Sequence, residues 1–332
     1  MLTTLNATME DILVKKAANR AGVNKNYMRK VIGIGEAILD IIFEKEQPQR
    51  AVVGGSVLNG MVSLSRLGIP VTFISETGDD RVGDMICNFM CENGMTTAYV
   101  DRFHRKSPVS LAFLGADKSA EYIFHTDYPE KRLNLPFPEI NENDIFVFGS
   151  FYALNPLFRD RFVEFLKEAK RHKALIYYDP NFRPSHKANV LSLRASFVEN
   201  CEYATIVRGS DEDFYHLYDK TDMNEIYSEV VKQYCDCFIS TYGSDGVSLF
   251  TENISVHFDS NQITPVSTIG AGDNFNAGII YGLLKYGVGC QDIPCLTKED
   301  WAKIIQCGID LSSEVCCSYS NYISFEYAEG YK

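Results

Sequence analysis

The sequence predicts an α/β protein with a Rossmann-like, mostly parallel central sheet, helices on both faces and a second, small β-sheet. Short apolar runs alternate with amphipathic helical patterns from Val31 onward, an order typical of βαβ units. Two stretches, Ala37–Phe43 and Val109–Phe124, are β-like and have no helical partners. We expect these two stretches to form a separate sheet that covers a site as a lid.

The elements of the central layer are predicted from runs of apolar residues and from their stop signals. Gly68 and Gly94 follow the last periodic residues of two helices, as expected after a helix C-terminus. The expected strands are Val31–Gly35, Val71–Ser75, Ile145–Gly149, Leu175–Asp179, Ala204–Val207 and Phe238–Thr241. The expected helices are Val57–Leu67, Val82–Asn93, Leu157–Arg171, Asn224–Gln233, Asn274–Tyr286 and Trp301–Cys317.

Two parts of the chain are distinguished. Residues 1–29 form an N-terminal extension, in which Thr8 and Asp11 have the spacing of a helix capping box. Either this segment is a packed helix or the natural start lies near Met28; both interpretations remain open. Residues 30–332 form one α/β domain, and its lid is expected at about 36–53 and 98–126, with a turn at Gly115–Lys118.

Composition excludes several classes of protein. The 332 residues include 32 Lys and Arg against 44 Asp and Glu, a net charge of −12, which argues against a dedicated nucleic-acid binder. No run approaches the roughly 18 apolar residues of a membrane span, and the first 30 residues lack a signal-peptide core. Ten cysteines without zinc-type spacing suggest reduced thiols, so we expect a cytoplasmic protein.

The strongest chemical signal is the turn Gly270-Ala271-Gly272-Asp273 at the start of a helix. Glycines let a ligand approach the backbone, and a helix N-terminus offers free N–H groups to an anion. The alternative is an ordinary junction with a capping carboxylate. Taken alone, the turn favours neither interpretation.

Three further segments carry polar residues in apolar surroundings. Gly54 and Gly55 precede a helix that places Asn59 in its first turns, and Asp40 lies within an otherwise apolar strand that follows Glu36. A polar loop, Asp179–Pro184, follows another strand, where ligands of open α/β sheets bind. The structural alternatives are a helix cap, a charge on an edge strand and a solvated Arg183.

Two nucleotide-binding signatures are weak or absent. The phosphate-loop pattern GxxxxGK[ST] does not occur. Gly33 and Gly35 hint at a dinucleotide fingerprint, but the third glycine is missing and the chain continues as a strand. A dehydrogenase is therefore a poor interpretation.

Taken together, the motifs resemble those of the PfkB, or ribokinase-like, carbohydrate kinases, with fructokinases closest in motif. The resemblance runs from about Met28 to the C-terminus and rests on six segments in the family's order. These segments are Gly35-Glu36 with Asp40, Gly54-Gly55 with Asn59, Arg66–Gly68 with Thr77–Gly83, Asp179–Arg183, Thr241–Gly246 and Gly270–Asp273.

The resemblance implies an ATP-dependent kinase and a role for each matching residue. Asp273 would be the catalytic base, and the amides of Gly270, Ala271 and Gly272 would form an anion hole for the transferring phosphoryl group. The sugar would be bound by Asp40, Gly54, Gly55, Asn59 and Arg183. The nucleotide would be contacted by Ser210, Asp213, Thr241, Gly243 and Gly246.

The resemblance also implies cofactors, with two departures from the family pattern. ATP and Mg²⁺ are expected, but no metal ligand is assigned because Ser210–Asp213 replaces the family's Asn-x-x-Glu. Ser267 stands where the family commonly has an Asp that helps to hold a monovalent cation, so activation by potassium is doubtful.

The substrate is predicted to be a neutral sugar, fructose first, because the second lid strand offers His125 rather than an Arg for a sugar acid. The product would be fructose 6-phosphate. The alternatives are 2-keto-3-deoxygluconate kinase or ribokinase-type activity, or a non-catalytic sugar-binding regulator on a kinase fold. The apolar lid strands also predict a homodimer that forms through the lid.

Overall fold

The computed structural model describes residues 29–115, 120–182 and 190–332. Within these residues the large sheet has nine strands, β1 (Val31–Ile34), β4 (Val71–Gly78), β5 (Val100–Phe103), β8 (Ile145–Gly149), β9 (Leu175–Asp179), β10 (Ile206–Ser210), β11 (Phe238–Thr241), β12 (Val247–Phe250) and β13 (Ser255–Phe258). Their order is β13-β12-β11-β10-β9-β8-β1-β4-β5. The strands from β5 to β11 are parallel, whereas β12 and β13 are antiparallel. The predicted fold class is confirmed.

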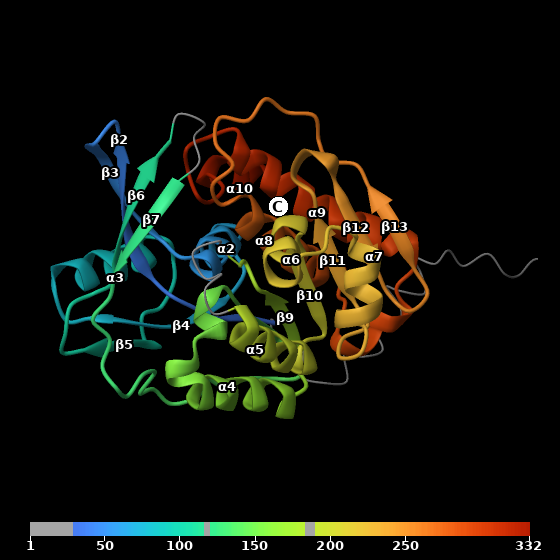
Figure 1. Ribbon diagram of the computed structural model, residues 1–332, viewed down its shortest axis with the longest axis horizontal. Coiled ribbons are helices and arrows are strands. Elements are labelled where there is room, and N and C mark those ends of the chain that lie inside the picture. Colours follow the sequence, from blue (N-terminus) through green and yellow to red (C-terminus); the bar gives the residue numbers. More distant parts are fainter. Residues whose placement is uncertain (1–28, 116–119, 183–189) are drawn as a thin grey trace, which may run out of the picture.

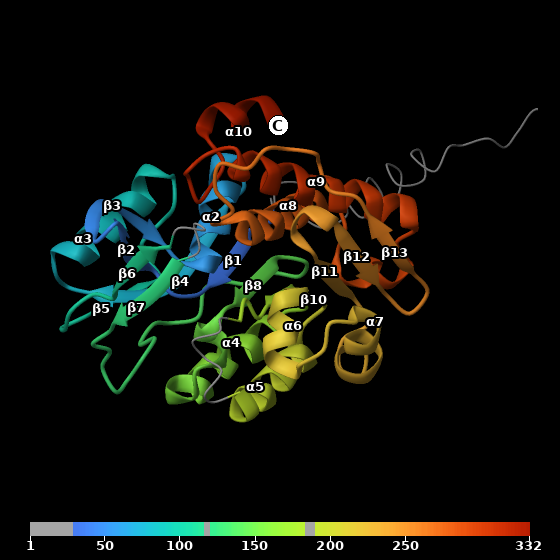
Figure 2. The ribbon, with the colours of Figure 1, turned by 45° about the horizontal axis from the view of Figure 1, so that its top comes forward.

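Helices cover both faces of this sheet (Figure 2). One face packs against α2 (Ser56–Arg66), α3 (Arg81–Glu92), α8 (Ala271–Lys285), α9 (Lys298–Cys316) and α10 (Phe325–Tyr331). The other packs against α4 (Arg159–Arg171), α5 (Val190–Tyr203), α6 (Asp211–Tyr218) and α7 (Met223–Ile226). Neighbouring residues of one strand enter opposite cores: Val31 lies in the first and Ile32 in the second.

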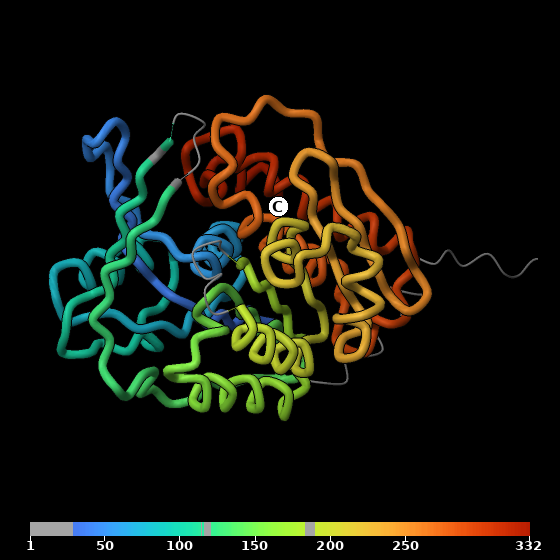
Figure 3. Tube along the Cα trace, viewed as in Figure 1, coloured from blue at the N-terminus to red at the C-terminus, as the bar shows by residue number. Residues whose placement is uncertain are grey.

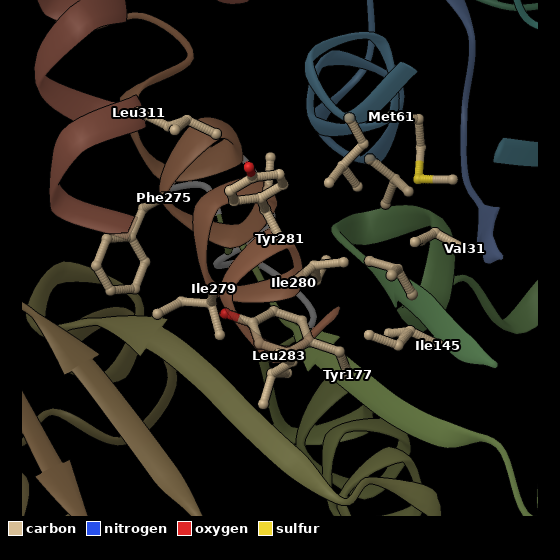
Figure 4. Packing of buried hydrophobic residues seen from close by; sticks show 14 of the residues in the cluster. Val31, Met61, Ile145, Tyr177, Phe275, Ile279, Ile280, Tyr281, Leu283 and Leu311 are labelled. Atoms are coloured by element: carbon tan, nitrogen blue, oxygen red, sulfur yellow. The ribbon is translucent and has the colours of Figure 1, made fainter. Parts of the chain in front are cut away.

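The first of these cores sets the position of α8. Ile279 and Ile280 of α8 are buried together with Val31, Ile145 and Tyr177 of the sheet (Figure 4). Because α8 packs so closely on the strands, its N-terminus is held near the carboxyl ends of the parallel strands, where open α/β sheets bind ligands.

The lid is a separate four-stranded sheet, as predicted, at the upper left of Figure 1. It consists of β2 (Ile38–Glu44), β3 (Gln47–Gly54), β6 (Val109–Leu114) and β7 (Ala120–His125), in the order β3-β2-β6-β7. The chain passes from β1 into β2 with only three residues between them (Figure 3). The lid therefore begins at the carboxyl end of β1.

Several predicted boundaries differ from the structure. Strand β5 lies in the range 98–126 assigned to the lid, but it pairs with β4 at the edge of the large sheet. The helix predicted at Asn224–Gln233 is the four-residue α7 followed by a π-helical turn, Tyr227–Val231, and that at Leu157 begins as a 3₁₀ turn, Pro156–Phe158. Strands β12 and β13 and helices α5, α6 and α10 were not predicted.

Other predictions fall outside the described residues. These are the N-terminal extension apart from Arg29, Arg183 and Pro184 at the end of the polar loop, and most of the turn at Gly115–Lys118. Within the described part of the chain, no helix has the length and apolar character needed to cross a membrane.

Candidate active site at the start of helix α8

The glycines before α8 bring the backbone of another segment against the helix start. Gly270 is the N-cap residue and has φ +80°, a conformation that favours glycine. A Cβ on Gly270 would lie 2.8 Å from the carbonyl oxygen of Asn321. A larger residue at this position would therefore push the two segments apart.

The amides of this turn are not equivalent. The Ala271 N–H donates to the carbonyl of Thr268 at 3.2 Å, so it does not point freely to a ligand as the predicted anion hole requires. The N–H groups of Gly270 and Gly272 have no backbone acceptor in the described residues. An anion at this helix start would thus be held mainly by Gly272, Gly270 and the positive end of the helix dipole.

Asp273 is held by two side chains from the start of α2. The Ser56 hydroxyl donates to Oδ1 of Asp273 at 2.8 Å, and the Asn59 amide donates to Oδ2 at 2.8 Å. Ser56 and Asn59 stand three residues apart and share one face of the helix. The first turns of α2 and α8 therefore meet at this carboxylate and fix its orientation.

A narrow pocket lies behind Asp273, between these two helices and the ends of β8 and β9. Its polar lining consists of Ser56, Asp179, Asp273 and Asn276. The two predicted segments around Asp273 and Asp179 are therefore brought to one place, although they stand almost a hundred residues apart in the sequence.

Asp40 faces the same region from the lid. Its Oδ2 lies 2.6 Å from the position that a Cβ on Gly54 would occupy, and the buried Ser110 of β6 donates a hydrogen bond to its other oxygen. Burial raises the pKa of Asp40 to about 6, and the nearby charges of Glu36 and Asp273 act in the same direction. Asp40 therefore lies beside Gly54, just before α2, the helix whose first turns contact Asp273.

Gly55 and Asn59, two of the residues expected to bind the sugar, lie at the start of α2. Gly55 has φ +136° and begins α2, and a Cβ there would lie 2.1 Å from the carbonyl oxygen of Glu36. Only glycine therefore allows the lid connection to pass this close to α2. Asn59 points its amide at Asp273, which makes it a positioning residue for the carboxylate.

The predicted nucleotide residues follow two neighbouring strands. Ser210 ends β10 and Thr241 ends β11, and the two are register partners. Gly243 has φ +56° with open space around its Cβ position, and Gly246 has φ +103°. Of these four residues, Gly243 is exposed, whereas Thr241 and Gly246 are buried, and a Cβ on Gly246 would lie 2.3 Å from the carbonyl oxygen of Phe258. An exposed backbone is therefore offered mainly at Gly243, beyond the carboxyl end of β11.

Asp213, expected to contact the nucleotide, makes hydrogen bonds at the start of α6. It is the third residue of α6, and its carboxylate accepts hydrogen bonds from the backbone and hydroxyl of Ser210 and from the N–H of Phe182. Burial raises its pKa to about 6, and the Asp179 carboxylate adds to the shift. Both oxygens have partners within the protein, so Asp213 fixes the backbone at Phe182 against the start of α6.

Sequence reasoning missed a buried ion pair beneath this edge. Arg208 of β10 donates to Asp179 at 2.9 Å and to the hydroxyl of Thr241 at 2.6 Å. Asn276 of α8 donates to the same Asp179 oxygen at 2.6 Å. The available signal was an arginine inside an apolar strand, since a buried charge requires a partner.

No cluster of His, Cys, Asp or Glu suited to a metal ion occurs in residues 29–115, 120–182 and 190–332. Mg²⁺ commonly binds through one or two carboxylates together with substrate phosphates, so a nucleotide-borne metal needs no dedicated cage. Of the carboxylates described above, Asp273 is the one that stands beside the helix start proposed to bind phosphate.

Comparison with known proteins agrees with this geometry. Residues 28–326 match the model of the pfkB family carbohydrate kinases. The chain belongs to this family. A fructokinase of Rhizobium leguminosarum is 25% identical over 260 residues, covering 76% of this chain and 79% of the relative.

A second relative is a kinase of aminoimidazole riboside. The aminoimidazole riboside kinase of Salmonella typhimurium is 25% identical over 274 residues, covering 82% of this pfkB-family chain and 85% of the relative. The Salmonella enterica enzyme, solved with aminoimidazole riboside and an ATP analogue, superposes with a TM-score of 0.77 at 22% identity, covering 91% of this chain and 99% of its own. The fold is thus shared along nearly the whole chain.

Proposed function

We propose that this carbohydrate kinase transfers the γ-phosphate of ATP to a hydroxymethyl group of a small neutral sugar, with fructose as the first candidate and fructose 6-phosphate as the product. The observation that carries the proposal is the placement of Asp273. Its carboxylate stands in the first turn of α8 and is oriented by Ser56 and Asn59 of α2, the helix that begins just after Gly54 and the adjoining Asp40 of the lid.

The proposed reaction uses three parts of the site. Asp40 and the backbone at Gly54 and Gly55 hold the sugar, while Asp273 accepts the proton of the hydroxyl group. The hydroxyl oxygen then attacks the γ-phosphorus, and the bond to ADP breaks with its electrons left on ADP. The start of α8 stabilises charge on the transferring group, which is the main catalytic requirement of phosphoryl transfer. Mg²⁺, when bound with ATP, would neutralise phosphate charge.

The nucleotide is assigned to the edge formed by Thr241, Gly243, Gly246 and Ser210. This edge is contiguous with α8 through Arg208, which contacts both Thr241 and the position beside Gly272. Phosphates placed between the edge and the helix start would therefore point to Asp273. From the sequence alone, we propose that Arg183 also binds the sugar.

The test is ADP release with ATP, Mg²⁺ and a panel of acceptors. The panel contains fructose, ribose, aminoimidazole riboside and 2-keto-3-deoxygluconate, because the relatives and the sequence motifs point to these classes. We expect fructose to give the highest kcat/KM. If another acceptor gives a higher kcat/KM than fructose, the proposed substrate is wrong but the proposed kinase activity stands. Sugar binding without ADP release from any of them would favour the non-catalytic regulator.

We also propose that two copies pair through their lids. Ile41, Leu111 and Ile123 are cross-strand neighbours and share one lid face, on which Phe43 and Phe113 stack at 4.8 Å. These side chains are partly or largely exposed, with Ile123 45% exposed. Exposed apolar faces commonly mark interfaces. Light scattering should give a dimer at micromolar concentration, and Ile123→Lys should give a monomer.

A further inference from the structure

The segment between α9 and α10 lies against the candidate active site. Asn321 in this segment packs its backbone onto Gly270: a Cβ on that glycine would be 2.8 Å from its carbonyl oxygen and 3.0 Å from its Cα. None of the motifs from the sequence analysis includes this segment. Figure 2 shows the chain before α10 running beside α2 and the start of α8.

Hydrogen bonds from both neighbouring helices hold the segment in place. The Asn274 amide of α8 donates to the carbonyl of Asn321 at 2.8 Å and to that of Gly270 at 2.7 Å. Ser63 of α2 accepts from the N–H of Ile323 at 3.2 Å. Arg66 of the same helix donates to the carbonyl of Ile323 at 2.7 Å. The backbone at Asn321 is therefore fixed relative to the helix start that carries Asp273.

The side chain of Asn321 reaches the sugar side of the site. Its amide nitrogen Nδ2 lies 3.8 Å from the position that a Cβ on Gly54 would occupy. Oδ2 of Asp40 lies 2.6 Å from the same position. The absent side chain of Gly54 thus leaves a space that is bounded by one carboxylate oxygen and one amide nitrogen.

The side-chain amide of Asn321 is a candidate hydrogen-bond donor to a ligand. Within residues 29–115, 120–182 and 190–332 it makes no hydrogen bond, and the residue is only partly exposed. An ionised carboxylate accepts hydrogen bonds, whereas an amide N–H donates them. A sugar hydroxyl does both, so it can donate to Asp40 while it accepts from Asn321.

The same segment also contacts the lid. The guanidinium of Arg50 in β3 lies 5.6 Å from the ring centroid of Tyr319, two residues before Asn321. Asn321 therefore stands between the lid, which carries Asp40, and the start of α8, which carries Asp273. This is the position from which a side chain can select the hydroxyl pattern of an acceptor.

We propose that Asn321 is a substrate-binding residue that donates a hydrogen bond to the sugar hydroxyl held by Asp40, and that it contributes to acceptor specificity. The inference rests on the proposed sugar kinase activity. It assigns the recognition of one hydroxyl group to a pair of side chains from two segments, of which the motifs reveal only Asp40.

The test compares Asn321→Ala and Asn321→Asp with the wild type, using the best acceptor of the panel. Loss of one neutral hydrogen bond should raise the KM for the sugar by about 3- to 10-fold. Asn321→Asp should raise it further, because it places a second carboxylate near Asp40. The KM for ATP and kcat should stay close to wild type. Ser320→Ala is the matched control, since the neighbouring Ser320 side chain makes no hydrogen bond in the described residues.

A set of monodeoxy analogues of the same sugar supplies the second readout. One analogue should have the same KM with the wild type and with Asn321→Ala, because it lacks the hydroxyl that the amide contacts. A purely structural role for Asn321 would raise the KM for every analogue alike and would overturn the inference. If Asn321→Ala has the same kcat and the same KM for the sugar as the wild type, the inference is overturned, whereas the kinase proposal stands. Absence of turnover by the wild type with every acceptor would overturn both.

Discussion

The two sheets of this molecule differ in how their faces are covered. Both faces of the large sheet lie under helices, and residues such as Ile32 and Val31 are completely buried on opposite sides. The lid has no such cover, and Ile123 and Phe124 of β7 are 45% and 47% exposed. The large sheet is therefore a scaffold packed on both sides. The lid is anchored near β1 through buried residues such as Leu39 and Val53, while its edge strand β7 is exposed, and we propose that the lid is the part that moves.

The candidate site uses one carboxylate from each part. Asp273 belongs to the scaffold, where both of its oxygens accept side-chain hydrogen bonds. Asp40 belongs to the lid and depends on one hydroxyl, that of Ser110. This difference suggests that the reacting group is held by the rigid part and that the sugar is detected by the movable one.

The largest effect is expected at the rigid carboxylate. Asp273→Asn keeps the size of the side chain but removes the proton acceptor, so kcat should fall on the order of 1,000-fold or more. Steady-state ADP release measures this loss, and the sugar affinity should change little. Glu299→Gln, an exposed acid in the first turn of α9, is the control. Near-normal turnover of Asp273→Asn would show that another group takes the proton.

The next effect compares a buried ion pair of the large sheet with an exposed ion pair in the segments that flank lid strands β6 and β7. Arg208→Ala leaves the buried Asp179 without its charged partner and should lower the free energy of unfolding by about 3–5 kcal/mol. Arg105→Ala removes the pair with Asp127 below the lid, where both side chains are 49% exposed, and should cost less than about 1 kcal/mol. Urea unfolding of both variants measures the difference. Equal losses would contradict the contrast between scaffold and lid.

A smaller effect is expected at the lid carboxylate. Asp40→Ala removes the acceptor of a sugar hydroxyl, so the KM for the sugar should rise about 10- to 100-fold with little change in the KM for ATP. In the wild type, saturating fructose should slow hydrogen exchange in Ala37–Phe43 and Val109–Phe113, even without nucleotide. The variant should lose this protection. Unchanged exchange with a sugar that is phosphorylated would establish a lid already closed in the free enzyme.

The parts that the sequence predicted are those whose signal is local. Glycines at a helix start and a periodic apolar face located α2 and α8, and strand–helix alternation gave the sheet. The residues that the sequence analysis did not identify depend on contacts between distant segments. Ser56 and Arg208 contact Asp273 and Asp179 only because α2, α8 and β10 converge in the fold. Asn321 is identified only from its position beside Gly54. Helix α6 was missed because it is short and begins with three acidic residues.

The smallest effect is a shift in pH dependence at the lid. The pKa of Asp40 is raised to about 6, and the hydrogen bond from Ser110 opposes this shift. If the ionised carboxylate binds the sugar, kcat/KM falls as the pH drops through about 6. Ser110→Ala removes the opposing hydrogen bond, so the acidic limb should move upward by roughly half a pH unit to one unit.

The pH dependence of the free energy of unfolding gives an independent check on the raised pKa of Asp40. Because the folded protein holds the Asp40 proton more tightly than the unfolded chain, this carboxyl group favours folding most below pH 4. That contribution is lost as the pH rises through about 6. The difference in unfolding free energy between Asp40→Asn and wild type should therefore grow in favour of the variant between pH 4 and pH 7. Thr251→Ala, in a loop far from the lid along the sheet, should leave both profiles unchanged. If the acidic limb of the kcat/KM profile does not move in Ser110→Ala, a group other than Asp40 causes that limb. This result would contradict the proposal that the lid detects the sugar.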